Sequence, residues 1–476
     1  MSALRMGRRL PRRTVPRALM ALGALVAIGF VAVNVAIGYV VIDGRLDGQW
    51  YDVRDLGIGV QELREWLDDR NAQQPGILDF LGQHWISYAV TALLGATGIL
   101  SIVGGALLIL IWVERRLIGR MQIRRGPNRV GPYGLLQPIA DAVKLIQKEV
   151  LMPRGADKVL FFLPPALIFI PMIVAWGPIP WGAQMAYLDV HVGILFLIAV
   201  SSLTTLAIFM AGWSSNNHYA LLGAMRTIAM MISYEIPLSI ALLSVVLLSG
   251  SMQLSTIVEW QSTHNVWLAA LLPLAMFTYF FSSTAELNRT PNDIAEAESE
   301  IVAGFHTEYS GMKFGLFYAV ELGNALFVAA LTATLFLGGW SLFGLEEWIP
   351  GYLILGAKIS AAYFLLVWLR GTLPRFRLDQ LMKFAWQFLI PLSLLNLLIV
   401  AVEASVFARW EVKGIVSLGL FAIVNWAAAI ILVREWARRM GYRPEREAVR
   451  QPILTQGVGG LQAARRLGAP EMGTQV

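Results

Sequence analysis

The sequence contains no cysteine, and charged residues are scarce. Without a thiol the chain cannot form a disulfide, ligate an iron–sulfur cluster through sulfur or build a thiolate zinc site. Only 15% of its 476 residues are charged and 57% are hydrophobic, with a mean hydropathy of +0.60. A water-soluble domain carries about 25% charged residues. Most of this chain is therefore expected to face lipid or other buried helices.

Long apolar runs supply the fold prediction. A helix needs about 20 apolar residues to cross the hydrocarbon core of a bilayer, where it satisfies its own backbone hydrogen bonds. We predict an all-α polytopic membrane protein with about ten transmembrane helices. They are expected near 18–42, 85–113, 159–180, 192–212, 228–250, 266–285, 321–343, 351–369, 384–402 and 414–433.

The arginine-rich start of the chain bears on its orientation. A signal peptide is one interpretation of the first 42 residues, but the apolar run is longer than a typical signal core and no clear cleavage site follows it. A retained helix is favoured. Ten helices place both ends on one side, and Lys and Arg concentrate in the loops of that side, which predicts cytoplasmic termini. We expect a multi-pass protein of the cell inner membrane.

Three charged residues lie inside the predicted spans or at their mouths. They are Glu235 in SYEIPLS, Glu321 in YAVELGN and Lys358 in GAKISAA. An ionised side chain costs about 2.5–3.5 kcal/mol at a helix centre on insertion scales, so such residues usually face a cavity or a partner. A structural ion pair, such as Glu321 with Lys358, is one interpretation. A buried relay that binds and releases protons is the other, and we favour it.

The loop between two of these spans is unusually acidic. It reads DIAEAESEIVAGFHTEY from Asp293 to Tyr309. If its start is helical, Asp293, Glu296 and Glu300 share one face, and the last two repel each other when both are charged. A solvated acidic face is the simple explanation. The apolar surroundings instead favour a loop folded against the bundle, in which carboxylates bind protons as a coupled group.

A second inner segment, 113–149, is rich in arginine and in turn residues. Its second half has apolar residues at helical spacing, which predicts an amphipathic helix near 134–149 along the inner membrane interface. Binding of lipid headgroups would explain the number of arginines. Their turn-rich order favours a docking surface for a protein on the inner face.

Motifs of self-contained catalysis are missing from the sequence. We find no P-loop, dinucleotide fingerprint, H-E-x-x-H or nucleophile elbow. The chain is therefore not expected to be catalytic alone, to hold a metal or other cofactor of its own, or to bind nucleic acid.

Five segments closely resemble the quinone-site membrane subunit of respiratory complex I, which in bacteria is the H subunit. They read ERRLIGRMQIRRGPNRVGPYGLLQPIADAVKLIQKE, AGWSSNN, LLGAMR…SYE, ELNRTPNDIAEAESEIVAGFHTEYSGMKFGLF and LRGTLPRFRLDQLMKFAW. The resemblance runs in the family's order from about 85 to 402 and covers its eight usual helices. It implies a core at 85–407, with an extra helix and an outer acidic loop in 1–84 and an extra helix and an inner tail in 408–476.

The resemblance implies a membrane subunit of a proton-translocating NADH:quinone oxidoreductase. Such a subunit forms the quinone-access cavity at the junction of the membrane arm and the peripheral arm, and it couples quinone reduction to proton movement. Quinone, such as ubiquinone, is the substrate and enters from the lipid bilayer. FMN and the iron–sulfur clusters belong to partner subunits of the two arms.

The motifs also assign site residues by position. The quinone-cavity residues so implied are Arg115, Arg116, Arg124, Arg125, Arg226, Phe305, Arg370, Arg375 and Arg377. The proton-coupling carboxylates so implied are Glu114, Glu235, Asp293, Glu296, Glu298, Glu300, Glu308 and Glu321.

Two departures and two alternatives accompany the resemblance. Asn292 stands where many family members have Phe, and Leu322 where an aromatic residue often follows the glutamate. One alternative is the related subunit of a ferredoxin-fed, reduced-deazaflavin-fed or hydrogenase-linked complex, which shares the scaffold. The other is a stand-alone ion transporter, although no inverted repeat is obvious in the sequence.

Overall fold

A computed structural model describes residues 84–183, 185–293, 303–409 and 415–439. The chain divides into two compact units, 1–426 and 427–476, and the second is described only over 427–439. Every regular element in the described ranges is a helix, and these ranges contain no strand. The predicted all-α polytopic class is confirmed. The three predicted domain ranges remain predictions.

Nine of the ten predicted spans fall on described residues, and each coincides with helical structure; the first, 18–42, lies outside those residues. Seven helical segments are long and apolar enough to cross a bilayer. They are α3 (His84–Met121), α6 (Gly193–Ser214), α7 (His218–Ser249), α12 (Met312–Phe336), α13 (Gly351–Thr372), α14–α15 (Leu378–Phe384 and Ile390–Arg409, joined by the π-helical turn Ala385–Leu389) and α16 (Ile415–Arg439).

Two predicted spans are shorter or interrupted, and proline explains both. The predicted 159–180 span is α5 (Lys158–Val174), which ends before Pro178 and Pro180. The predicted 266–285 span is split into α9 (Leu268–Leu271) and α10 (Pro273–Glu286). Leu272 between them has φ −121° and ψ 60°, because a residue before proline is sterically driven out of the helical region.

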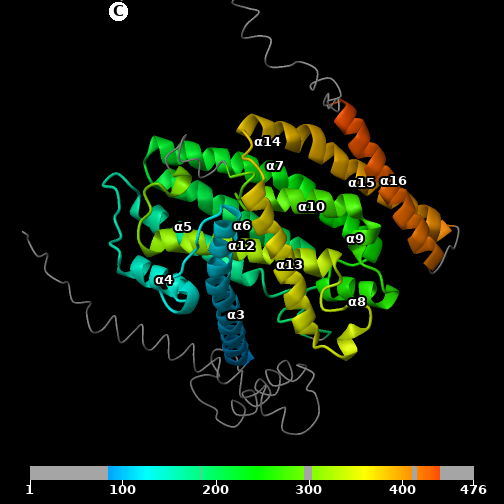
Figure 1. Cartoon of the computed structure of the whole chain (residues 1–476), viewed down its shortest axis with the longest axis horizontal. Helices are drawn as coiled ribbons and strands as arrows, with labels where there is room; N and C mark the ends of the chain where they lie inside the picture. Colours follow the sequence, from blue (N-terminus) through cyan, green and yellow to red (C-terminus); the bar gives the residue numbers. More distant parts are fainter. Residues whose placement is uncertain (1–83, 184, 294–302, 410–414, 440–476) are drawn as a thin grey trace, which may run out of the picture. The chain divides into compact units, whose positions relative to one another are not determined.

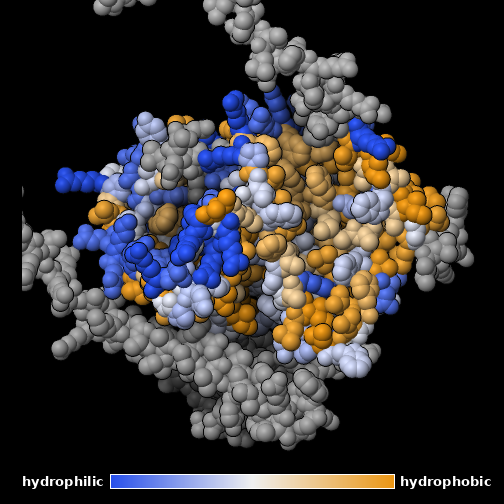
Figure 2. Space-filling view, in the orientation of Figure 1, coloured by the Kyte–Doolittle hydropathy of each residue, from blue (hydrophilic) through white to orange (hydrophobic). Residues whose placement is uncertain are grey.

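The predicted interfacial helix is present as α4 (Gln137–Gln147). Its apolar residues are about half exposed, including Ile139 at 48% and Ile146 at 56%. Partly exposed apolar residues along one side of α4 suit a helix lying in the membrane interface. Figure 2 shows hydrophilic side chains gathered over α4 and the neighbouring end of α3, where arginines follow the span.

Helix α12 lies at the centre of the first unit. It contacts α3, α5, α10 and α13 and is the most buried of the described spans (Figure 1). Small residues allow this close packing; a Cβ added at Gly323 would lie 2.2 Å from the Met172 side chain of α5. Charged residues placed on α12 are thus surrounded by protein on most sides.

The turn after α12 binds Lys358 of α13. Its ammonium donates hydrogen bonds to the carbonyls of Leu337 at 2.6 Å, Gly339 at 2.9 Å and Ser341 at 2.5 Å. Gly339 has φ +53°, a left-handed conformation that glycine adopts without steric cost. The lysine therefore caps the free carbonyls at the end of α12.

This arrangement excludes the ion pair between Glu321 and Lys358, the less favoured of the two interpretations of these charges. Glu321 lies sixteen residues before Leu337, which is about 24 Å along a helix at about 1.5 Å per residue. Because α12 and α13 are neighbours joined by a short turn, Lys358 lies near that turn and Glu321 lies far from it. Glu321 finds a different partner.

Candidate functional site

Glu114 is the centre of a buried charge cluster at one end of the bundle. It lies near the end of α3 and is only 4% exposed. The Tyr363 hydroxyl donates to its Oε2 at 2.8 Å, and the guanidinium of Arg370 donates to its Oε1. Both donors come from the last turns of α13, so α3 and α13 meet here through a carboxylate. A carboxylate with several donors is held as the anion.

Arg289 joins Glu114 to Glu321. It lies three residues after α10 and is 4% exposed. Its Nη1 is 3.5 Å from Glu114 Oε2, and its Nε is 3.3 Å from Glu321 Oε1. Burial alone disfavours the charged guanidinium, but the two carboxylates outweigh burial and raise the pKa of Arg289. One buried cation is thereby shared by two carboxylates from two different helices.

Two further ion pairs lie at the rim of this cluster. Arg115 donates to Asp141 of α4 at 2.6 Å, which ties the interfacial helix to α3. Burial opposes ionisation of Asp141, yet the hydrogen bond from Arg115 prevails and lowers the pKa of Asp141. Arg375 lies 3.4 Å from Asp293. The rim is thus charged, while the centre is closed to solvent.

Two cavities continue from Glu321 into the bundle. The first, named here the Glu321 cavity, has a volume of about 50 Å³ and is lined by Glu321, His306 and Glu286 among others. The second, the Tyr279 cavity, has about 70 Å³ and is lined by Tyr279 and also by Glu286. One water molecule needs roughly 10–15 Å³ of such a cavity volume. Each cavity has room for several waters.

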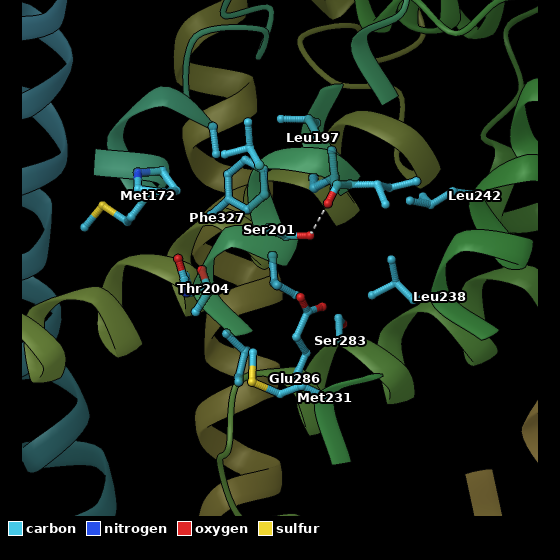
Figure 3. Close-up of a pocket in the computed structure, with 18 of the residues that line it drawn as sticks. Met172, Leu197, Ser201, Thr204, Met231, Leu238, Leu242, Ser283, Glu286 and Phe327 are labelled. Carbon is cyan, nitrogen blue, oxygen red and sulfur yellow. Dashed lines mark hydrogen bonds between the residues drawn. The ribbon is translucent and has the colours of Figure 1, made fainter. Parts of the chain in front are cut away.

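Figure 3 shows the Tyr279 cavity, with the Glu286 carboxyl pointing into it from the last turn of α10. On the opposite side Ser201 donates to the Ile198 carbonyl at 2.9 Å. Glu286 lines the Glu321 cavity as well, so Glu286 and Glu321 face one enclosed space. Glu235 is half-buried on α7, which packs against α10.

Other predicted site residues lie around this centre. Phe305 is 7% exposed, lines the Glu321 cavity and packs edge-on against Phe317 with ring centres 5.5 Å apart. Glu308 accepts a hydrogen bond from Asn217 at 2.7 Å. Arg226 is half-buried on α7. Of these three residues, Phe305 lines one of the two cavities, whereas Glu308 and Arg226 line neither.

The remaining predicted arginines point outward. Arg116 stacks between the Trp112 and Tyr133 rings, 5.0 and 5.6 Å from their centres. Four others are exposed, namely Arg124, Arg125, Arg375 and Arg377. Glu296, Glu298 and Glu300 lie outside the described residues.

Sequence reasoning missed several residues of the centre. They are Arg289, Tyr363, Glu286, His306 and Asp141. Glu286 and Arg289 carry a usable signal, because both fall where a predicted apolar span ends. Tyr363 and Asp141 carry none, because their partners are remote in sequence. Among the described residues, no group of three or more acidic or histidine side chains is placed to hold a metal ion.

Comparison with known sequences identifies the family of this chain. The sequence model of the family described as NADH dehydrogenase matches residues 94–401. The H subunit of the NADH-quinone oxidoreductase of Dehalococcoides mccartyi (strain CBDB1) is 50% identical over 331 residues, covering 69% of this chain and 91% of the relative. The corresponding protein of Geobacillus thermodenitrificans is 47% identical over 346 residues, covering 72% of this chain and 100% of the relative.

A third relative, the H subunit of the Rhodospirillum centenum enzyme, is 45% identical over 325 residues, covering 67% of this chain and 96% of the relative. The matched family region contains Glu114, Arg289, Glu321 and Arg370, so the charge cluster lies wholly within it. The chain belongs to the NADH dehydrogenase family, as its loop motifs predicted.

Proposed function

We propose that this chain is the membrane subunit of a proton-pumping NADH:quinone oxidoreductase that forms the quinone-access cavity and couples quinone reduction to proton movement. The relatives' names support a quinone-reducing complex over a hydrogenase-linked or deazaflavin-fed one. The observation that carries the coupling proposal is the sharing of Arg289 between Glu114 and Glu321.

Quinone reduction to quinol adds two electrons and two protons. Negative charge that develops beside the cluster attracts the guanidinium of Arg289 and weakens its contact with Glu321. Two unit charges 4 Å apart interact by about 4 kcal/mol at an effective dielectric constant near 20. That energy corresponds to about a thousandfold change in a proton-binding equilibrium.

Loss of this contact makes Glu321 a proton acceptor. The proton comes from the cavities behind it, both of which Glu286 lines, and Glu235 lies on the neighbouring helix α7. Interacting carboxyls titrate as a group, so uptake at one of them changes occupancy at the others. The site thus converts a change of charge at the quinone into proton movement along the interior carboxyls.

The proposal is tested by replacing Glu235 and Glu321 singly with Gln in the complete complex, reconstituted in vesicles. Gln keeps the size and much of the hydrogen bonding but does not titrate. Both variants are expected to assemble and to lose most quinone-coupled proton pumping. Full pumping with full quinone turnover in both variants would show that the two acids are structural only.

The exposed arginines support a partner surface on the same side. Arg124, Arg125, Arg375 and Arg377 are exposed in the segments that follow α3 and α13, the two helices that supply Glu114 and Arg370. We propose that segments 114–133 and 370–379 contact a peripheral-arm subunit. Cross-linking of the intact complex is expected to trap both segments on that subunit, and lipid adducts alone at both segments would overturn this part of the proposal.

A further inference from the structure

The Glu321 and Tyr279 cavities adjoin each other. Five residues line both, so these residues form the partition between the cavities. They are Thr204, Met231, Glu286, Leu287 and Asn324. Met231 and Leu287 are 3% and 5% exposed and offer no useful hydrogen bond to water. Hydrogen bonds to water at the partition therefore depend on the side chains of Thr204, Glu286 and Asn324.

Asn324 lines the Glu321 cavity together with Glu321 and Glu286. It follows Glu321 by three residues on α12, so the two side chains lie on the same face one turn apart. Its amide carries two N–H donors and one acceptor oxygen. Unlike Glu286, it neither gains nor loses a proton under physiological conditions. It can therefore orient water without changing charge.

We propose that Asn324 is a positioning residue for proton transfer, whose amide holds water in the Glu321 cavity and so connects Glu321 with Glu286, which line that same cavity. This inference rests on the proposed coupling function. A bound water needs two to four polar partners, and without the amide the partition offers only the Thr204 hydroxyl and Glu286 itself. The role of Asn324 is to keep water between the Glu321 and Glu286 carboxyls in the Glu321 cavity and, because its side chain also lines the Tyr279 cavity, to extend the hydrogen-bonded path there.

The transfer along this path balances at each step. An O–H bond breaks at a protonated carboxyl on one side, and a water molecule gains that proton. The same water gives up another proton to the next water, and the last water forms an O–H bond at the carboxylate on the other side. The amide of Asn324 accepts and donates hydrogen bonds throughout and is itself unchanged.

The test compares Asn324→Leu with Asn324→Ser in the complete complex in sealed vesicles, measuring protons translocated per electron. Leu keeps the volume and removes the hydrogen bonds, whereas Ser leaves space for a water and keeps a hydroxyl. We expect the ratio to fall by at least half in Asn324→Leu, with a larger fall in pumping than in quinone reduction. Asn324→Ser is expected to restore most of the ratio.

Asn396→Leu is the matched control. Asn396 is also a buried amide, 1% exposed, and donates to Ser244 at 3.1 Å between α15 and α7. It lines neither cavity. Asn396→Leu is expected to reduce thermal stability and to leave the proton-to-electron ratio unchanged.

Three outcomes separate this inference from the proposed function. An unchanged ratio in Asn324→Leu, with a loss in Glu321→Gln, overturns the inference alone. Unchanged ratios in both variants overturn the coupling function itself. Equal losses in Asn324→Ser and Asn324→Leu would show that filling or shape, rather than water, is what matters at this position, and would also overturn the inference.

Discussion

The buried Arg289 and the half-buried Lys358 are two interior cations of the described chain that are stabilised by different kinds of partner. Arg289 lies between the carboxylates of Glu114 and Glu321, which come from two helices. Lys358 lies among three backbone carbonyls of one turn. Carbonyl dipoles cannot gain or lose protons, whereas carboxylates can. The lysine is therefore a fixed structural cap, and the arginine is part of a cluster whose charge can change.

The largest effect is expected from removing the shared cation. Arg289→Met leaves Glu114 and Glu321 buried without their common partner, and breaking a buried pair costs about 3–5 kcal/mol. We expect loss of most assembled complex and of nearly all quinone reduction. Arg289→Met combined with Glu321→Gln removes one unpaired charge and is expected to recover assembly. Normal activity in Arg289→Met alone would contradict the importance of the cluster. Blue-native gels and NADH:quinone activity measure both effects.

Replacing Lys358 is expected to lower the stability of the complex without changing its proton coupling. In Lys358→Met the carbonyls at the end of α12 lose their donor, and buried unsatisfied groups cost about 1–3 kcal/mol. We expect a lower thermal midpoint of the purified complex and an unchanged number of protons per electron. A fall in the number of protons per electron at a normal thermal midpoint would mean that Lys358, like Arg289, takes part in coupling.

His306 provides a smaller, pH-dependent effect. Burial lowers the pKa of His306 to about 4, below its ordinary 6.5. The unfolded chain therefore binds a proton below about pH 6.5 that the folded chain does not, so stability falls as the pH drops from 6.5 towards 4, by up to about 1.4 kcal/mol per unit. Glu286, Glu321 and Tyr318 line the same cavity and can modulate this effect.

His306→Gln is expected to flatten the fall of the thermal midpoint between about pH 7 and pH 5. The matched control is His264→Gln, because His264 is exposed on α8 (Leu254–His264). An equal pH dependence in the wild type and His306→Gln would rule out a buried neutral imidazole.

The smallest effect concerns Glu346, beside the Lys358 turn. It accepts hydrogen bonds from the Leu342 and Gly344 N–H groups at 2.9 and 3.1 Å and from the Ser341 hydroxyl at 2.9 Å. Partial burial opposes ionisation, but these hydrogen bonds prevail and lower the pKa of Glu346. Its stabilising contribution is thus present above its ordinary pKa and disappears as the pH falls through the lowered value.

Glu346→Gln is expected to cost about 1 kcal/mol near neutral pH and less in acid. The proton-to-electron ratio should stay at the wild-type value, because the residue faces a turn rather than a cavity. A lowered proton-to-electron ratio in Glu346→Gln would contradict a purely structural role for the turn that binds Lys358. Thermal midpoints at about pH 7 and about pH 4 provide the measurement.

The sequence predicted what depends on local composition. Apolar runs predicted the spans, and the rarity of carboxylates in such runs identified Glu321 and Glu235. Sequence patterns did not show which helix ends lie side by side, and the partners of the charged residues depend on that. The sequence left open an ion pair of Glu321 with Lys358 beside the favoured proton relay, and only the direction of α12 and α13, which places the two residues far apart, excludes that pair. Arg289, remote from Glu114 in the chain, became visible as its partner only in three dimensions.

The coupling function requires that Glu321 change its protonation state when quinone is reduced. Infrared difference spectra of the intact complex, recorded on quinone reduction, detect such a change through the carboxyl C=O stretch. We expect a carboxyl band in the wild type that is missing in Glu321→Gln and retained in Glu346→Gln. The same band in the wild type and in Glu321→Gln would show that Glu321 does not change its protonation state.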